Sequence, residues 1–185
     1  MALTKTPVCD FGKKAEDFKL KSINNEVITL NDIKGEKATL IMFICNHCPY
    51  VKAIIRDLAL DCNKLKKDGI NSVAIMSNDT KNYPEDSFDN MIKFAKTNNF
   101  GEINYLIDET QEIARKYGAV CTPDFFGYNK ELKLQYRGRF SELKDLKPVV
   151  GGDSDLKIAM KMISETQAGP KEQIPSMGCN IKWFN

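Results

Sequence analysis

Apolar and polar positions alternate along the chain in a way that predicts strands and helices in turn. Segment 38–44 is almost entirely apolar, as expected of a central strand that is covered on both faces. From Val51 to Leu65, apolar residues recur at spacings of three and four, which predicts an amphipathic helix that ends at Gly69. This order of elements favours an α/β fold with a largely parallel sheet.

The rest of the chain continues the alternation. Segments 18–21 and 27–30 flank Asn24 and Asn25, and they are predicted to form an N-terminal hairpin. Further strands are expected at 70–77, 104–107, 124–128 and 132–136. Further helices are expected at 84–99, with Phe88, Met91, Ile92 and Ala95 on one face, at 109–117, and after an N-cap at Asp153.

The C-terminal segment 165–185 lacks periodicity and contains Gly169, Pro170 and Pro175, so we expect an irregular tail that wraps over the protein. The sequence shows no internal repeat, low-complexity tract or linker. A length of 185 residues fits one domain. Residues 1–185 are therefore predicted to form a single domain that includes this tail.

Composition excludes several classes of protein. The chain is 42% apolar and 28% charged, which is ordinary for a globular protein and argues against disordered or fibrous architectures. A net charge of +2 gives no reason to expect nucleic acid or an anionic membrane as partner. No apolar run approaches the ~20 residues of a membrane span. Because the N-terminal segment lacks the apolar stretch of a signal peptide, we expect a cytoplasmic protein.

The cysteines are the most informative residues. Their uneven spacing, without a secretion signal, argues against a structural disulfide framework. The six cysteines are Cys9, Cys45, Cys48, Cys62, Cys121 and Cys179. Only Cys45 and Cys48 lie close together in the sequence, so the candidate chemistry centres on this pair.

Cys45 and Cys48 form a Cys-x-x-Cys motif between a buried strand and the start of a helix. The positive end of the helix dipole and the free amides there stabilise a thiolate, which is the reactive form of cysteine. The two-residue spacing lets one sulfur reach the other, so the pair can close and open a disulfide. A donating or cationic His47 between them would stabilise the thiolate further. The motif therefore predicts a redox-active site.

Thr122 and Pro123 form a second element of this candidate site. X-Pro bonds are the usual place to find a cis peptide. A cis-proline loop that faces the Cys-x-x-Cys motif would let a substrate backbone pair beside the sulfurs. We therefore expect Thr122 and Pro123 to bind substrate.

Two motifs carry a resemblance to a known family. Cys45-Asn-His-Cys-Pro-Tyr-Val-Lys and Ser176-Met-Gly-Cys-Asn-Ile-Lys-Trp, with the order of elements around them, resemble the peroxiredoxin-type branch of the thioredoxin fold. This branch is the alkyl hydroperoxide reductase/thiol-specific antioxidant family, and the resemblance covers about residues 8–184. It implies a three-layer sandwich, with a mixed central sheet flanked by helices and an N-terminal hairpin extension. It also implies a role in cell redox homeostasis.

The chain departs from both parent patterns. In a peroxiredoxin the motif is Pro-x-x-x-Thr/Ser-x-x-Cys, and here Cys48 takes the peroxidatic position while Ile41 and Cys45 replace the Pro and the Thr. The arginine that holds the peroxide in that family is not evident. Compared with thioredoxin, Ile44 replaces the Trp before the first cysteine, and Thr39 takes the place of the buried acid. These departures disfavour efficient peroxidase chemistry.

The function expected from these features is that of a thiol–disulfide oxidoreductase. Following the thioredoxin pattern, in which the first cysteine is the more exposed, we expect Cys45 to be the nucleophile and Cys48 the resolving cysteine, with His47 tuning the thiolate. The peroxiredoxin pattern, through Pro49, favours Cys48 as the attacking sulfur, and the alternative is a thiol peroxidase with Cys48 peroxidatic. Cys179 is a candidate resolving cysteine. The expected partner is a protein or small-molecule thiol or disulfide, or a hydroperoxide in the alternative, and no organic cofactor is expected.

A second alternative is a non-catalytic binding or metal-binding module on the same fold. Cys45, His47, Cys48 and Cys121 carry the donor atoms that zinc prefers. Three of them, however, would crowd a single turn, and the sequence has no second Cys-x-x-Cys. No metal site is therefore predicted. For Cys9 and Cys62 no catalytic role is expected. Cys121 should lie near the active site if Pro123 follows a cis peptide bond, and its role is left open between local packing and function.

Overall fold

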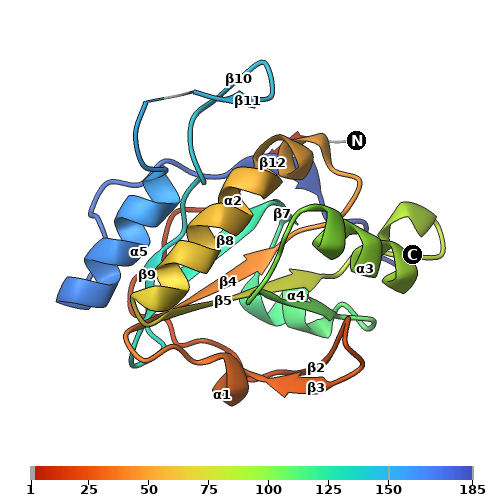
Figure 1. Cartoon of the computed structure of the whole chain (residues 1–185), viewed down its shortest axis with the longest axis horizontal. Helices are drawn as coiled ribbons and strands as arrows, with labels where there is room; N and C mark the ends of the chain where they lie inside the picture. Colours follow the sequence, from red (N-terminus) through yellow and green to blue (C-terminus); the bar gives the residue numbers. More distant parts are fainter. Residues whose placement is uncertain (1–2, 150, 185) are drawn as a thin grey trace.

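The computed structural model describes residues 3–149 and 151–184 of the chain. A seven-stranded mixed sheet lies at its centre, in the order β3-β2-β6-β5-β4-β8-β9 (Figure 1). The strands of this sheet are β2 (Lys19–Ser22), β3 (Val27–Thr29), β4 (Ala38–Phe43), β5 (Ile70–Met76), β6 (Asn104–Ile107), β8 (Asp124–Asn129) and β9 (Leu134–Tyr136). Only the β4–β5 and β5–β6 pairs are parallel, so the expectation of a largely parallel sheet was wrong. Antiparallel hairpins extend the sheet at both edges.

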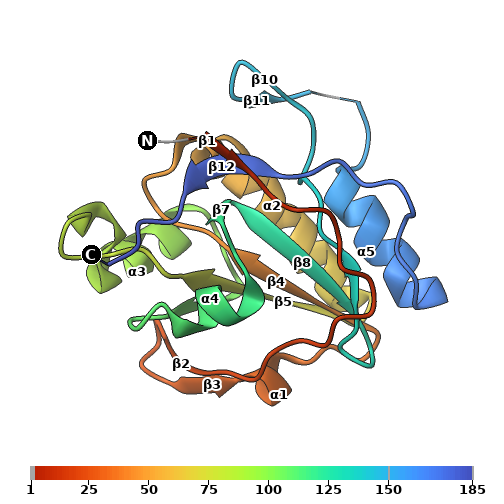
Figure 2. The same ribbon diagram turned by 180° about the vertical axis from the view of Figure 1, so that it is seen from behind.

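Helices cover both faces of the sheet, which makes three layers (Figures 1 and 2). One face packs against α2 (Pro49–Lys67), α3 (Phe88–Thr97) and α5 (Asp155–Thr166). The other face packs against α1 (Leu30–Ile33) and α4 (Glu112–Tyr117). This arrangement confirms the predicted fold class, the thioredoxin-like sandwich with an N-terminal hairpin.

The central strand β4 shows why its sequence is apolar without interruption. Leu40 and Met42 face the core below α2, whereas Ile41 and Phe43 face the core below α4. Because successive side chains of a strand point to opposite faces, a strand covered by helices on both sides needs apolar residues at every position.

Several element boundaries differ from the sequence-based expectation. Leu30 begins α1 rather than ending a strand, because Thr29 forms a capping box with Asp32. The predicted helix 84–99 is divided into a short 3₁₀ helix, η1 (Pro84–Asp86), and α3. On α3, Ile92 is exposed and does not share the buried face.

Two further helix starts were misplaced. The predicted helix 109–117 begins only at Glu112, after Gln111 in a left-handed conformation. The N-cap of α5 is Ser154, not Asp153, since the Ser154 side chain accepts a hydrogen bond from the Lys157 amide.

The C-terminal tail contains a strand that the sequence did not reveal. β12 (Met177–Asn180) lies between β1 (Leu3–Lys5) and β7 (Cys121–Thr122), so the expectation of a wholly irregular tail was wrong. The sequence did not reveal this strand because its hydrogen-bond partners come from distant parts of the chain. A strand of four residues is also too short to show a recognisable alternation of apolar and polar positions. A small hairpin of β10 (Leu143–Lys144) and β11 (Lys147–Pro148) was also not predicted. No helix within the described residues is long and apolar enough to cross a membrane.

Two leucines on the same helix provide a test of this packing. Leu58 is 1% exposed and belongs to the core between α2 and the sheet, whereas Leu60 is 56% exposed. We expect Leu58→Ala to lower the free energy of unfolding by about 2–5 kcal/mol, because it leaves a cavity. Leu60→Ala should change it by less than about 0.5 kcal/mol. Urea denaturation followed by circular dichroism measures both, and equal effects would contradict the packing described.

Candidate active site

The sequence of the Cys-x-x-Cys segment determines where the helix α2 begins. Cys48 is the N-cap residue, with extended backbone angles, and Pro49 occupies the first helical position. Proline suits that position because its missing N–H would have no partner in the helix. The Cys48 carbonyl accepts a hydrogen bond from the Lys52 amide at 3.0 Å. The Cys48 sulfur is thereby held at the positive end of a 19-residue helix.

Hydrogen bonds around Cys48 stabilise its thiolate. The Cys45 thiol is the main cause that lowers the pKa of Cys48 to about 5, with help from the Cys179 thiol and from the amides of Cys179 and Val51. Burial opposes the shift but does not cancel it. The Thr122 carbonyl oxygen lies 3.1 Å from the Cys48 sulfur and can accept a hydrogen bond from its thiol form. The hydrogen bonds donated to the sulfur outweigh this contact, because the pKa of Cys48 is lowered.

Cys45 behaves in the opposite way. Its pKa is raised well above the usual range, first by the hydrogen bond to Cys48, then by burial and by the charge of Asp86. Cys45 and Cys48 are both buried, at 1% and 0% exposure, so exposure does not distinguish the nucleophile from the resolving cysteine. These pKa directions favour Cys48 as the thiolate, the reverse of the order that the thioredoxin pattern suggested.

The Thr122–Pro123 peptide bond is cis, as predicted. Thr122 contacts both sulfurs: its Oγ1 lies 3.3 Å from Cys45 Sγ, and its carbonyl oxygen lies 3.1 Å from Cys48 Sγ. Pro123 lines a cavity of about 260 Å³ together with Tyr50 and Met177. The structure thus brings the predicted substrate-binding residues against the cysteine pair.

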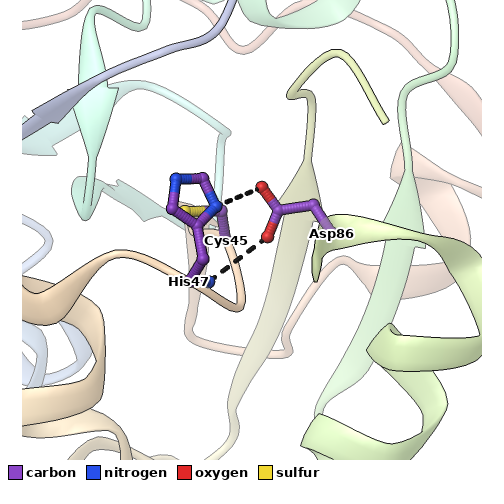
Figure 3. Close-up of side chains that lie close together, drawn as sticks. All are labelled: Cys45, His47 and Asp86. Atoms are coloured by element: carbon purple, nitrogen blue, oxygen red, sulfur yellow. Dashed lines mark hydrogen bonds and ion pairs between the residues drawn. The ribbon is translucent and has the colours of Figure 1, made fainter. Parts of the chain in front are cut away.

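His47 pairs with a buried carboxylate that the sequence analysis missed (Figure 3). Its Nδ1 lies 2.7 Å from Oδ2 of Asp86, which is fully buried. The amides of Asn46 and His47 donate to Oδ1 of Asp86, and the Asn78 side chain donates to Oδ2. The hydrogen bond to Asp86 raises the pKa of His47, while burial acts in the opposite direction.

The buried acid beside the motif is Asp86, which comes from a part of the chain distant from Thr39. Thr39 instead accepts a hydrogen bond from the Gly35 amide, within the strand region. Asp86 lies 39 residues beyond His47, in η1. An acidic residue after Pro84 is typical of a first helical turn, so the sequence offered no signal that this carboxylate is buried.

The grouping of candidate metal ligands differs from the one considered in the sequence. Among the described residues, Cys45, His47 and Asp86 offer ligand atoms that all lie within 4.8 Å of one another. Two of these atoms, His47 Nδ1 and Asp86 Oδ2, form a hydrogen bond with each other. The Cys121 sulfur is directed to the Pro123 carbonyl at 3.5 Å and does not join this group.

Three of the four arginines of the chain are engaged away from the sulfurs. Arg137 forms a buried ion pair with Asp124, and Arg139 pairs with Asp155. Arg115 lies over the ring of Trp183. In the described residues, the hydrogen bonds and ion pairs of Arg137 and Arg139 lead to groups other than Cys45 and Cys48.

Cys179 lies within the site, although it is 131 residues beyond Cys48. The two Sγ atoms are 3.0 Å apart, and both are buried. Cys62 lies on the buried face of α2, where burial raises its pKa to about 12. Cys9 is half-buried and forms no contact with the pair.

The chain is similar in sequence and in fold to known proteins. The family model described as AhpC/TSA family matches residues 11–139. A crystal structure of an uncharacterized conserved protein from Geobacillus kaustophilus has a TM-score of 0.94 and 39% identity, covering 100% of this chain and 97% of that one. A hypothetical protein from Sinorhizobium meliloti 1021 has a TM-score of 0.89 and 36% identity, covering 98% of each chain. No curated protein matches the chain.

More distant structures share the fold. The thioredoxin domain of a thiol-disulfide oxidoreductase from Bacteroides vulgatus has a TM-score of 0.58 and 18% identity, covering 69% of this chain and 86% of that domain. At this identity the likeness shows the thioredoxin fold alone. The family match supports a thiol-based redox function in general terms.

Removing the charge of Asp86 tests its pairing with His47. Because the pKa of His47 is raised in the folded state, the pair adds stability below the ordinary value of 6.5 that is lost as the pH rises through the folded-state pKa. Asp86→Asn should move the pKa of His47 back toward 6.5, and NMR titration of this single histidine measures it. Asp89→Asn, at an exposed position of α3, should leave it unchanged. An unaltered pKa in Asp86→Asn would contradict the assignment.

Proposed function

The chain belongs to the AhpC/TSA family, and we propose that it is a thiol–disulfide oxidoreductase that uses Cys45 and Cys48 as its dithiol–disulfide couple. The observation that carries this proposal is the pair of cysteine sulfurs at the start of α2, whose pKa values are shifted in opposite directions. The pKa of Cys48 is lowered to about 5, and Cys45 keeps its proton and donates a hydrogen bond to the Cys48 sulfur. Such a pair contains a nucleophile and a resolving thiol in contact.

In the proposed reaction Cys48 attacks first. Its thiolate attacks one sulfur of a partner disulfide, which forms a mixed disulfide and releases the first partner thiolate. Cys45 then attacks the Cys48 sulfur, closes the Cys45–Cys48 disulfide and expels the second partner thiolate, which takes the Cys45 proton. The reverse sequence oxidises a partner dithiol. This assignment exchanges the two roles that the thioredoxin pattern suggested.

His47 tunes the Cys48 thiolate in this proposal. The negative charge on Cys48 is one of the causes that raise the pKa of His47, so the protonated imidazole in turn stabilises the thiolate. Asp86 orients the ring through Nδ1, and Tyr83 stacks on it with ring centroids 5.6 Å apart. His47 and Asp86 thus act on the sulfur as a unit.

Thr122 and Pro123 supply the surface that receives the partner. Pro123 borders the cavity that also contacts Tyr50, two residues beyond Cys48, and most of the cavity wall is apolar. Because Cys45 and Cys48 are buried, a partner reaches them only when the covering residues move. We propose a protein or small-molecule thiol or disulfide as partner, in the cytoplasm and in the service of redox homeostasis.

The alternative function is a thiol peroxidase. It is supported by the acidic Cys48 followed by Pro49 and by the family match. In that reaction the Cys48 thiolate attacks a hydroperoxide, breaks its O–O bond and releases an alcohol or water, which leaves a sulfenic acid on Cys48. A neighbouring thiol then forms a disulfide with Cys48 with loss of water. The engagement of Arg137 and Arg139 with carboxylates weighs against it.

Differential alkylation with mass spectrometry distinguishes the two functions. Fully reduced protein receives one equivalent of oxidised glutathione or of hydrogen peroxide. The proposed function requires rapid closure of the Cys45–Cys48 disulfide with oxidised glutathione and slow consumption of hydrogen peroxide. Rapid peroxide consumption, with a trappable sulfenic acid at Cys48, would establish the peroxidase. No reaction with either reagent would leave the non-catalytic binding module.

Single cysteine variants test the two roles. Cys48→Ser should abolish reaction with oxidised glutathione at this site, because the remaining Cys45 has a raised pKa. Cys9→Ser should react like the wild type, because Cys9 lies outside the site. Stopped-flow measurement of thiol release gives the rates. Retained reactivity in Cys48→Ser would show that Cys48 is not the nucleophile.

The pH dependence of the reaction follows from the lowered pKa of Cys48. Above pH 5 the sulfur is already a thiolate, so the rate of disulfide exchange should vary little between pH 6 and 8. As the pH falls through about 5, the rate should decline about tenfold per unit. Thiolate absorbance in the ultraviolet, with Cys48→Ser as the blank, should show the same midpoint. A midpoint near 9.0, the ordinary value, would refute the assignment.

A further inference from the structure

The C-terminal strand β12 pairs with the edge of β7, beside the cis Thr122–Pro123 peptide bond. β12 pairs antiparallel with β7, with Cys179 opposite Thr122 and Asn180 opposite Cys121. Figure 2 shows β12 between β1 and β7. A substrate backbone is expected to pair at this edge, and in the structure the protein's own C-terminal strand does so.

Close approach at this edge is built into the sequence. A Cβ atom on Gly178 would lie 2.0 Å from the carbonyl oxygen of Thr122 and 3.1 Å from Cδ of Pro123, so only glycine fits there. The Ser176 hydroxyl donates to the Pro123 carbonyl at 2.8 Å, and the Ser176 amide donates to Thr6 Oγ1 at 3.0 Å. These contacts hold the register of β12 on the N-terminal side of Gly178.

This register brings Cys179 against Cys48. Their Sγ atoms are 3.0 Å apart, and the two residues are 4% and 0% exposed. Burial is the main cause that raises the pKa of Cys179 to about 12, followed by its hydrogen bond to Cys48. In the reduced protein, Cys179 therefore remains a thiol that donates to the Cys48 thiolate.

We propose that Cys179 is a second disulfide partner of Cys48, presented by β12 in the position of a substrate cysteine. This inference rests on the proposed function, because it uses the same Cys48 nucleophile. The site then contains one attacking sulfur with a resolving thiol on each of two segments, one before α2 and one at the C-terminus.

The reaction is balanced with a disulfide as the oxidant. The Cys48 thiolate attacks the external disulfide, forms a mixed disulfide and releases one thiolate. Cys179 then attacks the Cys48 sulfur, which forms the Cys48–Cys179 bond and breaks the mixed disulfide, and the proton of Cys179 goes to the second released thiolate. Two protein thiols are oxidised and one external disulfide is reduced to two thiols.

The two internal disulfides also interconvert without any external oxidant. Cys179 attacks Cys48 in the Cys45–Cys48 disulfide, and the new bond forms as the old one breaks. Cys45 leaves as a thiolate and takes the proton that Cys179 loses. Oxidising equivalents can thereby pass between the segment before α2 and the C-terminal strand.

The test removes Cys45 and asks which thiol resolves the mixed disulfide. Reduced Cys45→Ser, with Cys45→Ala as a second variant, receives one equivalent of oxidised glutathione. The protein is then denatured in acid, alkylated, digested and analysed by mass spectrometry. The double variants Cys45→Ser/Cys179→Ser and Cys45→Ser/Cys121→Ser are treated in the same way, and Cys121 is the matched control because it is the buried thiol on the neighbouring strand β7.

We expect Cys45→Ser and Cys45→Ser/Cys121→Ser to form the Cys48–Cys179 link and release both glutathione halves. In the double variant Cys45→Ser/Cys179→Ser, glutathione should stay bound to Cys48. If Cys45→Ser and Cys45→Ala both keep glutathione on Cys48 while Cys179 is alkylated, the inference is overturned. In that case, wild-type protein that closes the Cys45–Cys48 disulfide with oxidised glutathione would leave the proposed function standing. Wild-type protein that forms neither the Cys45–Cys48 nor the Cys48–Cys179 disulfide would overturn both the proposed function and this inference.

Discussion

Stabilisation of a negative charge on a fully buried sulfur is the constraint on which the site depends. Cys48 is 0% exposed, and burial alone would raise its pKa, as it does for Cys62. The start of α2, the thiols of Cys45 and Cys179 and the nearby amides reverse that shift. Pro49 contributes by ending the preceding loop at the correct residue, so that the sulfur lies at the end of the helix.

The layer that covers the sulfur is assembled from three distant parts of the chain. β1, β7 and β12 form a small sheet, and the close contact of Gly178 with Thr122 brings two of these strands together at the cysteines. This layer excludes water, which strengthens each hydrogen bond to the thiolate. It also means that a partner must displace part of the layer, so recognition and exposure of the sulfur are linked.

The site combines features of two patterns and adds one of its own. The cis Thr122–Pro123 bond beside a Cys-x-x-Cys pair is shared with thioredoxin, and the acidic cysteine before Pro49 is shared with peroxiredoxins. The buried acid, however, comes from η1 instead of from the central strand. Asp86 pairs with His47, which brings the segment between β5 and β6 to the cysteine pair.

The sequence alone determined the sheet-and-helix order, the Cys-x-x-Cys motif at the start of α2 and the cis bond before Pro123, because each depends on residues close together in the chain. It did not reveal the pairing of His47 with Asp86, the strand β12 or the order of acidity of Cys45 and Cys48. Those features are decided by the tertiary structure, since burial and hydrogen bonds to groups far apart in the sequence set them, and neither has a local pattern.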